Sequence, residues 1–512
     1  MSHRVVSAQG TREHVIPCLL LLAWLALVIF ATLRHEYWRD EIRAWSLAGA
    51  AQSPLDLFRL IRYEGHPILW YLVLYAGRSL DSRLALPTVS IAIATGAMAI
   101  FMFRSPFPLW MKTLFLFSAL PAYEYSVMAR NYGISMLLLF LFATLYPRRT
   151  ERSLALAFVL ALLANTNIHS TILAGLLLLV WGWDEWLSRR APANPVAGGR
   201  FALAATIVVL GLALAVIVVN PPKDTILTSV YSTSPTEWAT AARGAVLAPS
   251  AGFATLLPPL LPWALGHVLL YLAVLGLLQR PALFLAALAA LVALGVLFRV
   301  AYAGSYRHVG LYLCFLLSLY WIAIESTNRG TLPRLTQRLF DAGCYGALVV
   351  LILAGLYQDR RLGTDLHSEM SSSKAFGSFL NNSAEFHNAI LLPEPDYFME
   401  SVPYYASNPI YLARERRFGT AVTWSSRASI DLSLGQLITA ARDLKARFGR
   451  PVLVVLGHPS VATDSSGDIW YLYRKHFTWT PPEWREAQRL LTPVKVFNKA
   501  VGDENYWVYR VR

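Results

Sequence analysis

The chain has 512 residues, of which 56% are hydrophobic and only 15% are charged, and its apolar residues fall in long blocks. This composition excludes an ordinary soluble protein and indicates a membrane protein. The net charge of +14 is ordinary for basic loops between membrane spans, and no nucleic-acid-binding motif accompanies it, so nucleic acid is not an expected partner.

Eleven blocks are apolar and long enough to suggest membrane spans. A bilayer core about 30 Å thick requires roughly 20 apolar residues in a helix, because lipid offers no partner to an unpaired backbone group. We therefore expect a polytopic α-helical membrane protein with about 11 to 13 transmembrane helices. The blocks are 17–33, 84–103, 113–129, 131–146, 153–168, 170–187, 201–219, 252–278, 282–303, 309–325 and 339–356.

The loop after the first block, residues 34–66, is expected to contain helices of its own. Ser53 and Pro54 predict a helix start, with serine as the cap and proline at the first helical position. The apolar segment 67–80 corresponds to about 21 Å of helix, which is too short for an ordinary crossing. Both segments are predicted to be interfacial helices at the membrane surface.

The arginines indicate how the chain is oriented. With the N-terminus inside, the cluster of Arg148, Arg149 and Arg152 falls on the cytoplasmic side. Arginines such as Arg43 and Arg130 remain on the opposite side, against the usual bias, and we expect them to hold an anion. The predicted location is the inner (plasma) membrane, crossed many times.

The composition of the chain changes after Leu356. Residues 357–512 are richly charged, with strand-like runs at Ala389–Leu392, Pro451–Leu456 and Tyr506–Val511 and a helical pattern at Leu434–Phe448. This alternation predicts a soluble α/β domain. Eleven spans from an inside N-terminus place that domain on the extracytoplasmic, or periplasmic, side.

Charged side chains cluster where the first span ends. Asp40 and Glu41 lie just beyond it, and Arg43 is three residues after Asp40, so Asp40 and Arg43 share a face if the segment is helical. A carboxylate next to an arginine keeps a low pKa and stays ionised. The cluster is compatible with an active site and equally with an interfacial anchor, and its spacing does not decide between them.

Five short motifs resemble those of the GT-C membrane glycosyltransferases, in particular the branch that contains protein O-mannosyltransferases and the lipid A aminoarabinose transferase. That branch has an Asp-Glu pair at the start of the first extracytoplasmic loop, where this chain has Asp40-Glu41. The His-Pro-Pro-Leu motif is similar to His66–Leu69, which departs at its third position. Tyr125–Tyr132 matches a Tyr-x-x-x-Ala-Arg-x-Tyr pattern, Asn167–His169 loosely matches a Thr-His element, and Tyr306–His308 resembles an Arg-Tyr entry with histidine in place of tyrosine.

The resemblance implies a reaction and a division into domains. Residues 1–356 would be a GT-C-like transmembrane catalytic domain, and 357–512 an extracytoplasmic domain. The enzyme would be a hexosyl- or pentosyltransferase that moves a sugar, with inversion, from a polyprenyl-phosphate donor to an acceptor hydroxyl on a cell-envelope lipid, glycan or protein. Such chemistry needs a carboxylate to take the acceptor proton and cations to stabilise the departing lipid phosphate.

The motif residues and their neighbours would carry these roles. Asp40 is the expected base, and Glu41 is its substitute. The residues expected to bind the donor phosphate are Arg43, His66, Arg130 and Arg307. Glu64 is expected to position the acceptor or orient His66, and His169 to have a structural or acceptor-side role.

Partners and alternatives follow from the same resemblance. Some GT-C enzymes bind a divalent cation through acids such as Glu64, whereas this branch generally needs none, so no metal or other cofactor is expected. The expected partners are the lipid-linked donor, the acceptor and the bilayer. The alternative is a transporter or flippase of lipid-linked glycans, but here the ionisable residues lie at span ends and not at mid-membrane.

Overall fold

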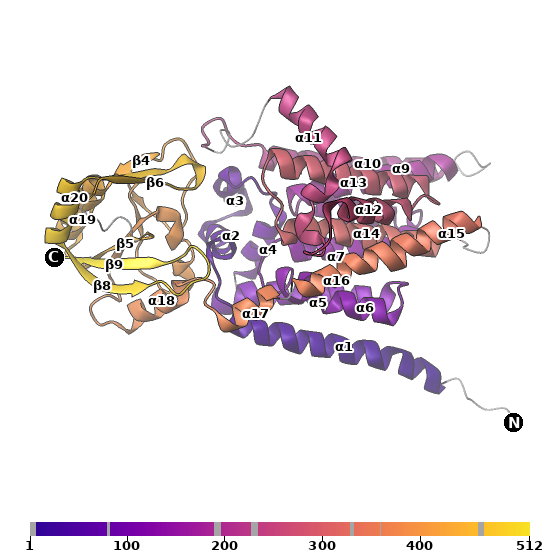
Figure 1. The fold of residues 1–512 in the computed structure, drawn as a ribbon, viewed down its shortest axis with the longest axis horizontal. Helices are drawn as coiled ribbons and strands as arrows, with labels where there is room; N and C mark the ends of the chain where they lie inside the picture. The colour runs from indigo at the N-terminus through magenta and orange to yellow at the C-terminus, as the bar shows by residue number, and fades with distance from the viewer. Residues whose placement is uncertain are drawn as a thin grey trace.

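The computed structural model describes residues 7–78, 82–188, 196–226, 234–327, 332–358, 360–458 and 465–512. A helical bundle occupies one end of the molecule and a strand-containing domain the other (Figure 1). The predicted polytopic helical fold with a C-terminal α/β domain is therefore confirmed. The helices of the bundle are α1 (Ser7–Arg34), α5 (Ser82–Arg104), α6 (Leu109–Leu116), α7 (Tyr132–Leu145), α8 (Ser153–Ala164), α9 (Ile168–Ser188), α10 (Val196–Val219), α11 (Pro235–Leu247), α12 (Trp263–Leu275), α13 (Pro281–Val300), α14 (Tyr306–Ser326), α15 (Arg334–Asp341) and α16 (Leu348–Tyr357).

Six helical segments of the described chain are long and apolar enough to cross a membrane, and each contains or overlaps one of the eleven predicted blocks. Three other blocks coincide with shorter apolar helices of 12 to 17 residues. The shorter helices do not qualify by length and composition alone, because a helix of 12 residues extends only about 18 Å, so the number of 11 to 13 spans stays a prediction. The six segments are His14–Arg34, Leu84–Arg104, Gly199–Val219, Pro281–Val300, Tyr306–Ser326 and Arg334–His367, and the shorter helices are Tyr132–Arg148, Ser153–Ala164 and Trp263–Leu275.

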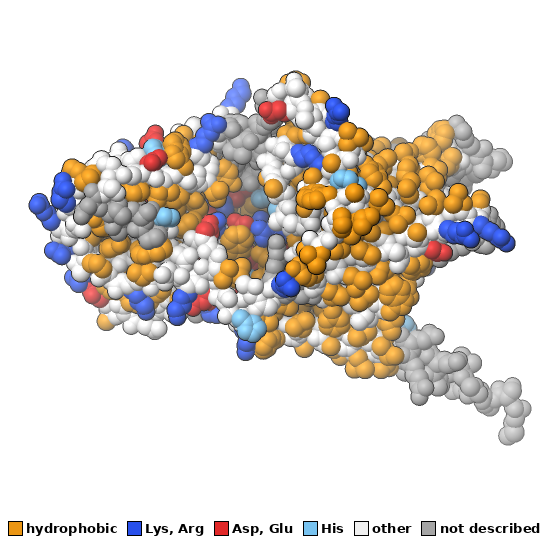
Figure 2. Space-filling model, in the orientation of Figure 1, with side chains coloured by type: hydrophobic (Ala, Val, Ile, Leu, Met, Phe, Trp, Pro, Cys, Tyr) orange, Lys and Arg blue, Asp and Glu red, His pale blue; other side chains and the backbone are white. Residues whose placement is uncertain are grey.

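The helices differ in how much of their surface faces outward. In α14, 83% of the most apolar window is buried inside the protein, whereas in α1 the figure is 22%. Helix α14 is thus central and α1 lies at the edge of the bundle (Figure 1). Figure 2 shows hydrophobic side chains covering the visible flank of the bundle, with charged side chains on the strand-containing domain and at the far end of the helices. This distribution suits a bundle surrounded by lipid.

The block 113–129 does not form the continuous span that the sequence predicts. Helix α6 ends at Leu116, a π-helical turn η2 (Leu120–Glu124) follows, and turns continue to Asn131 before α7 begins. Pro121 lacks an amide hydrogen and so cannot continue the α-helical hydrogen-bond pattern. A Cβ atom on Gly133 would lie 2.6 Å from the carbonyl oxygen of Tyr125, so only glycine lets α7 approach this segment so closely. The interruption carries Arg130 to the end of the bundle.

Three short helices form a layer between the bundle and the strand-containing domain: α2 (Arg39–Ala50), α3 (Pro54–Leu60) and α4 (Leu69–Gly77) (Figure 1). The predicted helix start is confirmed, because Ser53 caps α3 and its side chain accepts a hydrogen bond from the Asp56 amide at 3.1 Å. Helix α4 confirms a short helix within residues 67–80.

The C-terminal domain contains three small sheets. Its main sheet has the strand order β1-β5-β9-β8, in which only β1 and β5 are parallel, and a second sheet has the order β4-β7-β6. The predicted strands and the helix Leu434–Phe448 are confirmed within two residues. The elements are α17 (Arg360–His367), α18 (Ser373–Asn382), β1 (Ile390–Glu394), β2 (Tyr411–Leu412), β3 (Arg417–Phe418), β4 (Asp431–Ser433), α19 (Leu434–Phe448), β5 (Val452–Leu456), β6 (Gly467–Trp470), β7 (His476–Trp479), α20 (Pro481–Leu490), β8 (Leu491–Phe497) and β9 (Tyr506–Val511).

Candidate active site

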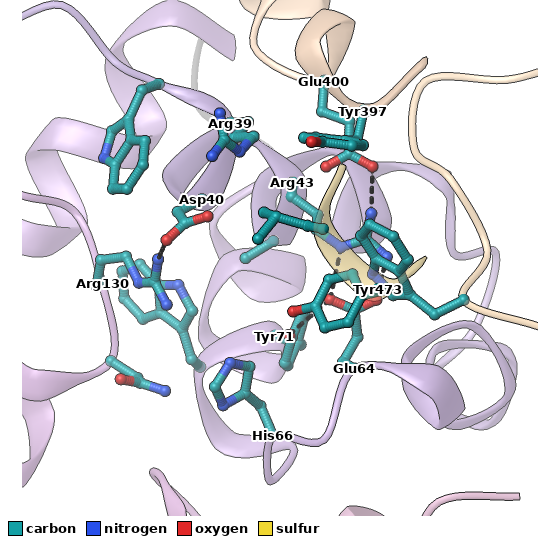
Figure 3. Close-up of a pocket in the computed structure, with 16 residues that line it drawn as sticks. Arg39, Asp40, Arg43, Glu64, His66, Tyr71, Arg130, Tyr397, Glu400 and Tyr473 are labelled. Carbon is teal, nitrogen blue, oxygen red and sulfur yellow. Dashed lines mark hydrogen bonds and ion pairs between the residues drawn. The ribbon is translucent and has the colours of Figure 1, made fainter. Parts of the chain in front are cut away.

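A cavity of about 330 Å³ lies where the bundle, the short-helix layer and the C-terminal domain meet (Figure 3). Cationic, acidic and aromatic side chains face one another in it, which is the mixture expected of a site for a polar ligand. Its lining residues are Trp38, Arg39, Asp40, Arg43, Ala44, Glu64, His66, Trp70, Tyr71, Arg130, Asn131, Tyr397, Glu400, Trp424, Leu472 and Tyr473.

Asp40 lies in the first turn of α2 and faces this cavity. Its Oδ2 atom forms ion pairs with Arg130 at 2.6 Å and with Arg307 at 3.8 Å, and 36% of the side chain is exposed. Burial alone would raise the pKa of the carboxyl, but Arg130, Arg307 and Arg39 outweigh burial and lower the pKa to about 2. Asp40 is thus ionised at neutral pH, and neither ion pair uses its Oδ1 atom.

The two arginines paired with Asp40 come from distant parts of the chain. Arg130 lies in the interrupted segment before α7 and lines the cavity, and Arg307 lies in the first turn of α14. The Arg307 guanidinium is also 5.5 Å from the ring centre of Trp38. Asp40, Arg130 and Arg307, which were predicted from separate parts of the sequence, therefore lie together in the structure.

Arg43 lines the same cavity, one helical turn beyond Asp40, but it does not pair with Asp40. Its guanidinium donates two hydrogen bonds to Glu64, at 2.8 and 2.5 Å, one to Glu400, and one to the Val422 carbonyl at 2.8 Å. The expected low pKa of Asp40 is confirmed, but Arg130, Arg307 and Arg39 lower it, while two closer carboxylates occupy the guanidinium of Arg43. The same contacts explain Glu64, which binds Arg43 and not His66.

His66 lines the cavity as a neutral side chain. Burial, reinforced by Arg130 and opposed by Glu64, lowers the pKa of its imidazole to about 4. Its Nδ1 atom is buried without a hydrogen-bond partner among the residues that the structure describes. His66 thus offers a hydrogen bond but no positive charge at neutral pH, and its expected role in binding the donor phosphate stays a prediction.

Glu41 points away from the cavity. One of its carboxylate oxygens accepts a hydrogen bond from the Ala129 amide at 2.7 Å, and the other lies 3.0 Å from His35 Nε2. His35 Nδ1 is 2.7 Å from Asp365 of α17. This buried cluster joins the end of α1, helix α2 and α17, so the expectation that Glu41 can replace Asp40 as a base is wrong.

His169 lies outside the cavity lining. Its Nε2 atom is 2.6 Å from the Tyr302 hydroxyl, and its ring stacks on His308 with centroids 5.3 Å apart. It therefore belongs to an aromatic cluster at the bundle end. Within the described ranges, no group of three or more His, Cys, Asp and Glu side chains is arranged to hold a metal ion.

The C-terminal domain supplies lining residues that sequence reasoning missed, namely Tyr397, Glu400, Trp424, Leu472 and Tyr473. Tyr397 and Glu400 directly follow β1, at the carboxyl end of the parallel strand pair, where open α/β sheets commonly bind ligands. Burial raises the pKa of Glu400 to about 7, although Arg43 opposes this shift. Only the position after a predicted strand could have signalled these two residues.

The C-terminal domain also holds the start of α2. Glu504 accepts a hydrogen bond from the Arg39 amide at 2.9 Å, and hydrogen bonds from Ser371 and Ser401 at 2.5 and 2.9 Å. Asp503 binds the Arg39 guanidinium through two bonds of 2.6 and 2.9 Å. The residue before Asp40 is therefore fixed by the opposite end of the chain.

Replacing Glu504 with glutamine should destabilise the junction by about 2 kcal/mol, because an amide oxygen is a weaker acceptor for these buried donors than a carboxylate. The measurement is the thermal unfolding midpoint of the full chain in detergent. Glu385→Gln is the matched control, since the pair of Glu385 with Arg510 is exposed on both sides. Equal midpoints for the two variants would contradict a clamp on α2.

The chain was also compared with known proteins. No protein-family model and no curated protein matches the chain. Among solved structures, the chain is similar to the crystal structure of ArnT from Cupriavidus metallidurans in the apo state, with 13% sequence identity, a TM-score of 0.47 and 98% of each chain covered. At this identity and TM-score, the likeness assigns no activity to the chain.

Proposed function

We propose that this protein is a membrane glycosyltransferase that moves a sugar from a polyprenyl-phosphate donor to an acceptor hydroxyl on a cell-envelope lipid, glycan or protein. The reaction inverts the anomeric centre, requires no cofactor and takes place at the extracytoplasmic face of the inner membrane. The observation that carries this proposal is an ionised Asp40 paired with Arg130 and Arg307 in a cavity at the end of an apolar helical bundle. A lipid-linked donor in the bilayer and a water-soluble acceptor can both reach a cavity at such a boundary.

The arginines suit a phosphate on geometric and electrostatic grounds. A guanidinium can bind a phosphate through two parallel hydrogen bonds and remains charged at any physiological pH. Arg130 lines the cavity, and Arg307, which does not line it, approaches the same Asp40 oxygen at 3.8 Å, so a phosphate beside Asp40 would lie in the field of two cations. Arg43 is less available, because Glu64 and Glu400 already neutralise it.

Donor binding would also prepare the base. With its pKa lowered to about 2, Asp40 is a weak base while the arginines act on it alone. A bound phosphate shares their positive field, and burial then dominates and raises the pKa of Asp40. Asp40 can accept the acceptor proton through Oδ1 as the acceptor oxygen attacks the anomeric carbon and the lipid phosphate leaves.

The test separates transfer from transport. The purified full chain is incubated with polyprenyl-phosphate-linked sugars and envelope extract, and the products are read by mass spectrometry. A transferase yields a glycosylated acceptor and free polyprenyl phosphate. In proteoliposomes, movement of the intact donor between leaflets without a glycosylated product would instead favour the flippase alternative.

A further inference from the structure

The C-terminal domain presents an aromatic wall to the cavity. The wall consists of Tyr397, Trp424 and Tyr473, which come from three separate segments. The ring centroids of Trp424 and Tyr473 are 4.5 Å apart, and those of Tyr397 and Trp424 are 6.0 Å apart. In Figure 3, Tyr473 lies across the pocket from Asp40 and Arg130. The ion pair of Asp40 with Arg130 thus comes from the membrane part and this aromatic wall from the soluble part, although Trp70 and Tyr71 of the membrane part and Glu400 of the soluble part also line the cavity.

The backbone that carries Tyr473 is strained. Tyr473 and Arg474 both adopt the left-handed conformation, with φ of 57° and 59°, in the turn between β6 and β7. This conformation is unfavourable for a residue with a side chain of this kind. Such strain persists only where the surrounding structure holds it, and it is concentrated at functional sites.

Specific contacts hold this turn in place. The Tyr471 amide donates a hydrogen bond to the Lys475 carbonyl at 2.7 Å and closes the turn. The buried Lys475 ammonium pairs with Asp396 at 2.6 Å and lies 4.9 Å from the ring centre of Trp424. These contacts hold the turn against Trp424, so the side chain of Tyr473 is held in place at the cavity.

Polar groups border the wall. The carboxylates of Glu64 and Glu400 and the hydroxyl of Tyr71 line the same cavity. Although Arg43 engages both carboxylates, each ionised oxygen can accept more than one hydrogen bond. A sugar ring has an apolar face of C–H groups and a rim of hydroxyls, so an aromatic face edged by carboxylates complements it.

We infer that Tyr473, supported by Trp424, forms the subsite for the sugar ring of the lipid-linked donor, so that the C-terminal domain selects the sugar that the membrane part transfers. This inference rests on the proposed function. The donor phosphate lies toward Arg130 and the ring lies against Tyr473, with the anomeric carbon between them near Asp40. A cavity of about 330 Å³ is large enough for a single sugar ring with its phosphate.

The left-handed backbone at Tyr473 allows a variant that distinguishes loss of the aromatic ring from loss of folding. Asparagine tolerates this conformation better than tyrosine, so Tyr473→Asn removes the ring and relieves the strain together. Tyr473→Phe keeps the ring and removes only the hydroxyl. Trp470→Ala is the matched control, because Trp470 is an exposed aromatic of the same hairpin and does not line the cavity.

The experiment compares the affinity of the full chain in detergent for farnesyl phosphate and for farnesyl phosphate carrying mannose, glucose or arabinose. Wild type should bind at least one sugar-bearing probe about tenfold more tightly than bare farnesyl phosphate. Tyr473→Asn should lose most of this gain while its affinity for bare farnesyl phosphate and its unfolding midpoint are maintained. Tyr473→Phe and Trp470→Ala should keep the gain.

The outcomes that would contradict the inference distinguish a failure of the sugar subsite from a failure of the proposed function. If wild type binds the bare probe but no sugar adds affinity, or if Tyr473→Asn keeps the gain, the subsite is wrong and the donor class stands. If Tyr473→Asn lowers the unfolding midpoint and weakens all probes alike, Tyr473 is structural and the subsite is again wrong. If wild type binds no farnesyl phosphate in any form, the proposed donor class fails, and the subsite falls with it.

Discussion

Asp40→Asn should lower the rate of sugar transfer by about a thousandfold while binding of the donor phosphate becomes tighter. An amide has nearly the shape of a carboxylate but cannot take a proton, and loss of a general base typically costs 10² to 10⁴ in rate. The substitution also removes the negative charge that Arg130 and Arg307 share, so both cations become more available to a phosphate. The measurement is turnover of a lipid-linked donor together with its dissociation constant.

The opposite signs of these two effects separate chemistry from folding. A variant that merely unfolded would lose binding and turnover together. Asp468→Asn is the matched control, because Asp468 lies on an exposed part of β6 outside the cavity lining and should leave both quantities unchanged. Normal turnover by Asp40→Asn would contradict the assignment of the base.

Sequence reasoning could nominate residues of the membrane part because span ends on one side of a bilayer must lie at one level. Asp40, Arg130 and Arg307 are far apart in the chain, yet each lies at the end of an apolar block, and they meet in space. The helix α19 and the strand β9 could also be predicted, since their periodicity and capping residues are local. Local signals therefore located these elements and the residues of this ion-pair cluster.

The orientation of neighbouring side chains was harder to predict. Successive residues of a helix point about 100° apart, so Asp40 and Glu41 cannot both face one cavity once the segment is helical. Asp40 and Arg43 do share a face, as predicted, but the long side chain of Arg43 reaches carboxylates that are closer in space. One of these, Glu400, is 357 residues away in sequence, and nothing local in the sequence marks such a contact.

Not every apolar block forms one long continuous helix, and the reason is physical. Apolar composition reports burial, but it does not distinguish lipid from protein surroundings or continuous from broken helices. Pro121 interrupts one block, and helices such as α8 are shorter than a full crossing. The aromatic wall was missed because Trp424 and Tyr473 lie outside the strands and α-helices, in segments that meet only through the tertiary fold of the C-terminal domain.

Arg130→Gln should weaken binding of farnesyl phosphate by about 10- to 100-fold, because a charge-assisted hydrogen bond to a buried phosphate contributes about 1.5 to 3 kcal/mol. The control is the double variant Arg43→Gln with Glu400→Gln, which removes both members of one ion pair and keeps the net charge of the cluster. That variant should bind farnesyl phosphate within a few-fold of wild type. If the double variant lost more affinity for farnesyl phosphate than Arg130→Gln, the phosphate-binding role would belong to Arg43 instead.

The same substitution should change how transfer depends on pH. In donor-free wild type, the arginines lower the pKa of Asp40 to about 2, below the ordinary value of 3.8, so in kcat/KM, which reports the free enzyme, the base stays ionised throughout the measurable range. Without Arg130, burial is less opposed and the pKa of Asp40 rises. Because only the ionised carboxylate accepts a proton, activity should then be lost on acidification at a higher pH in Arg130→Gln than in wild type. If Arg130 bound only the phosphate and did not act on Asp40, Arg130→Gln would weaken donor binding without shifting the acidic side of the pH profile. A shift would therefore link Arg130 to the base as well as to the donor.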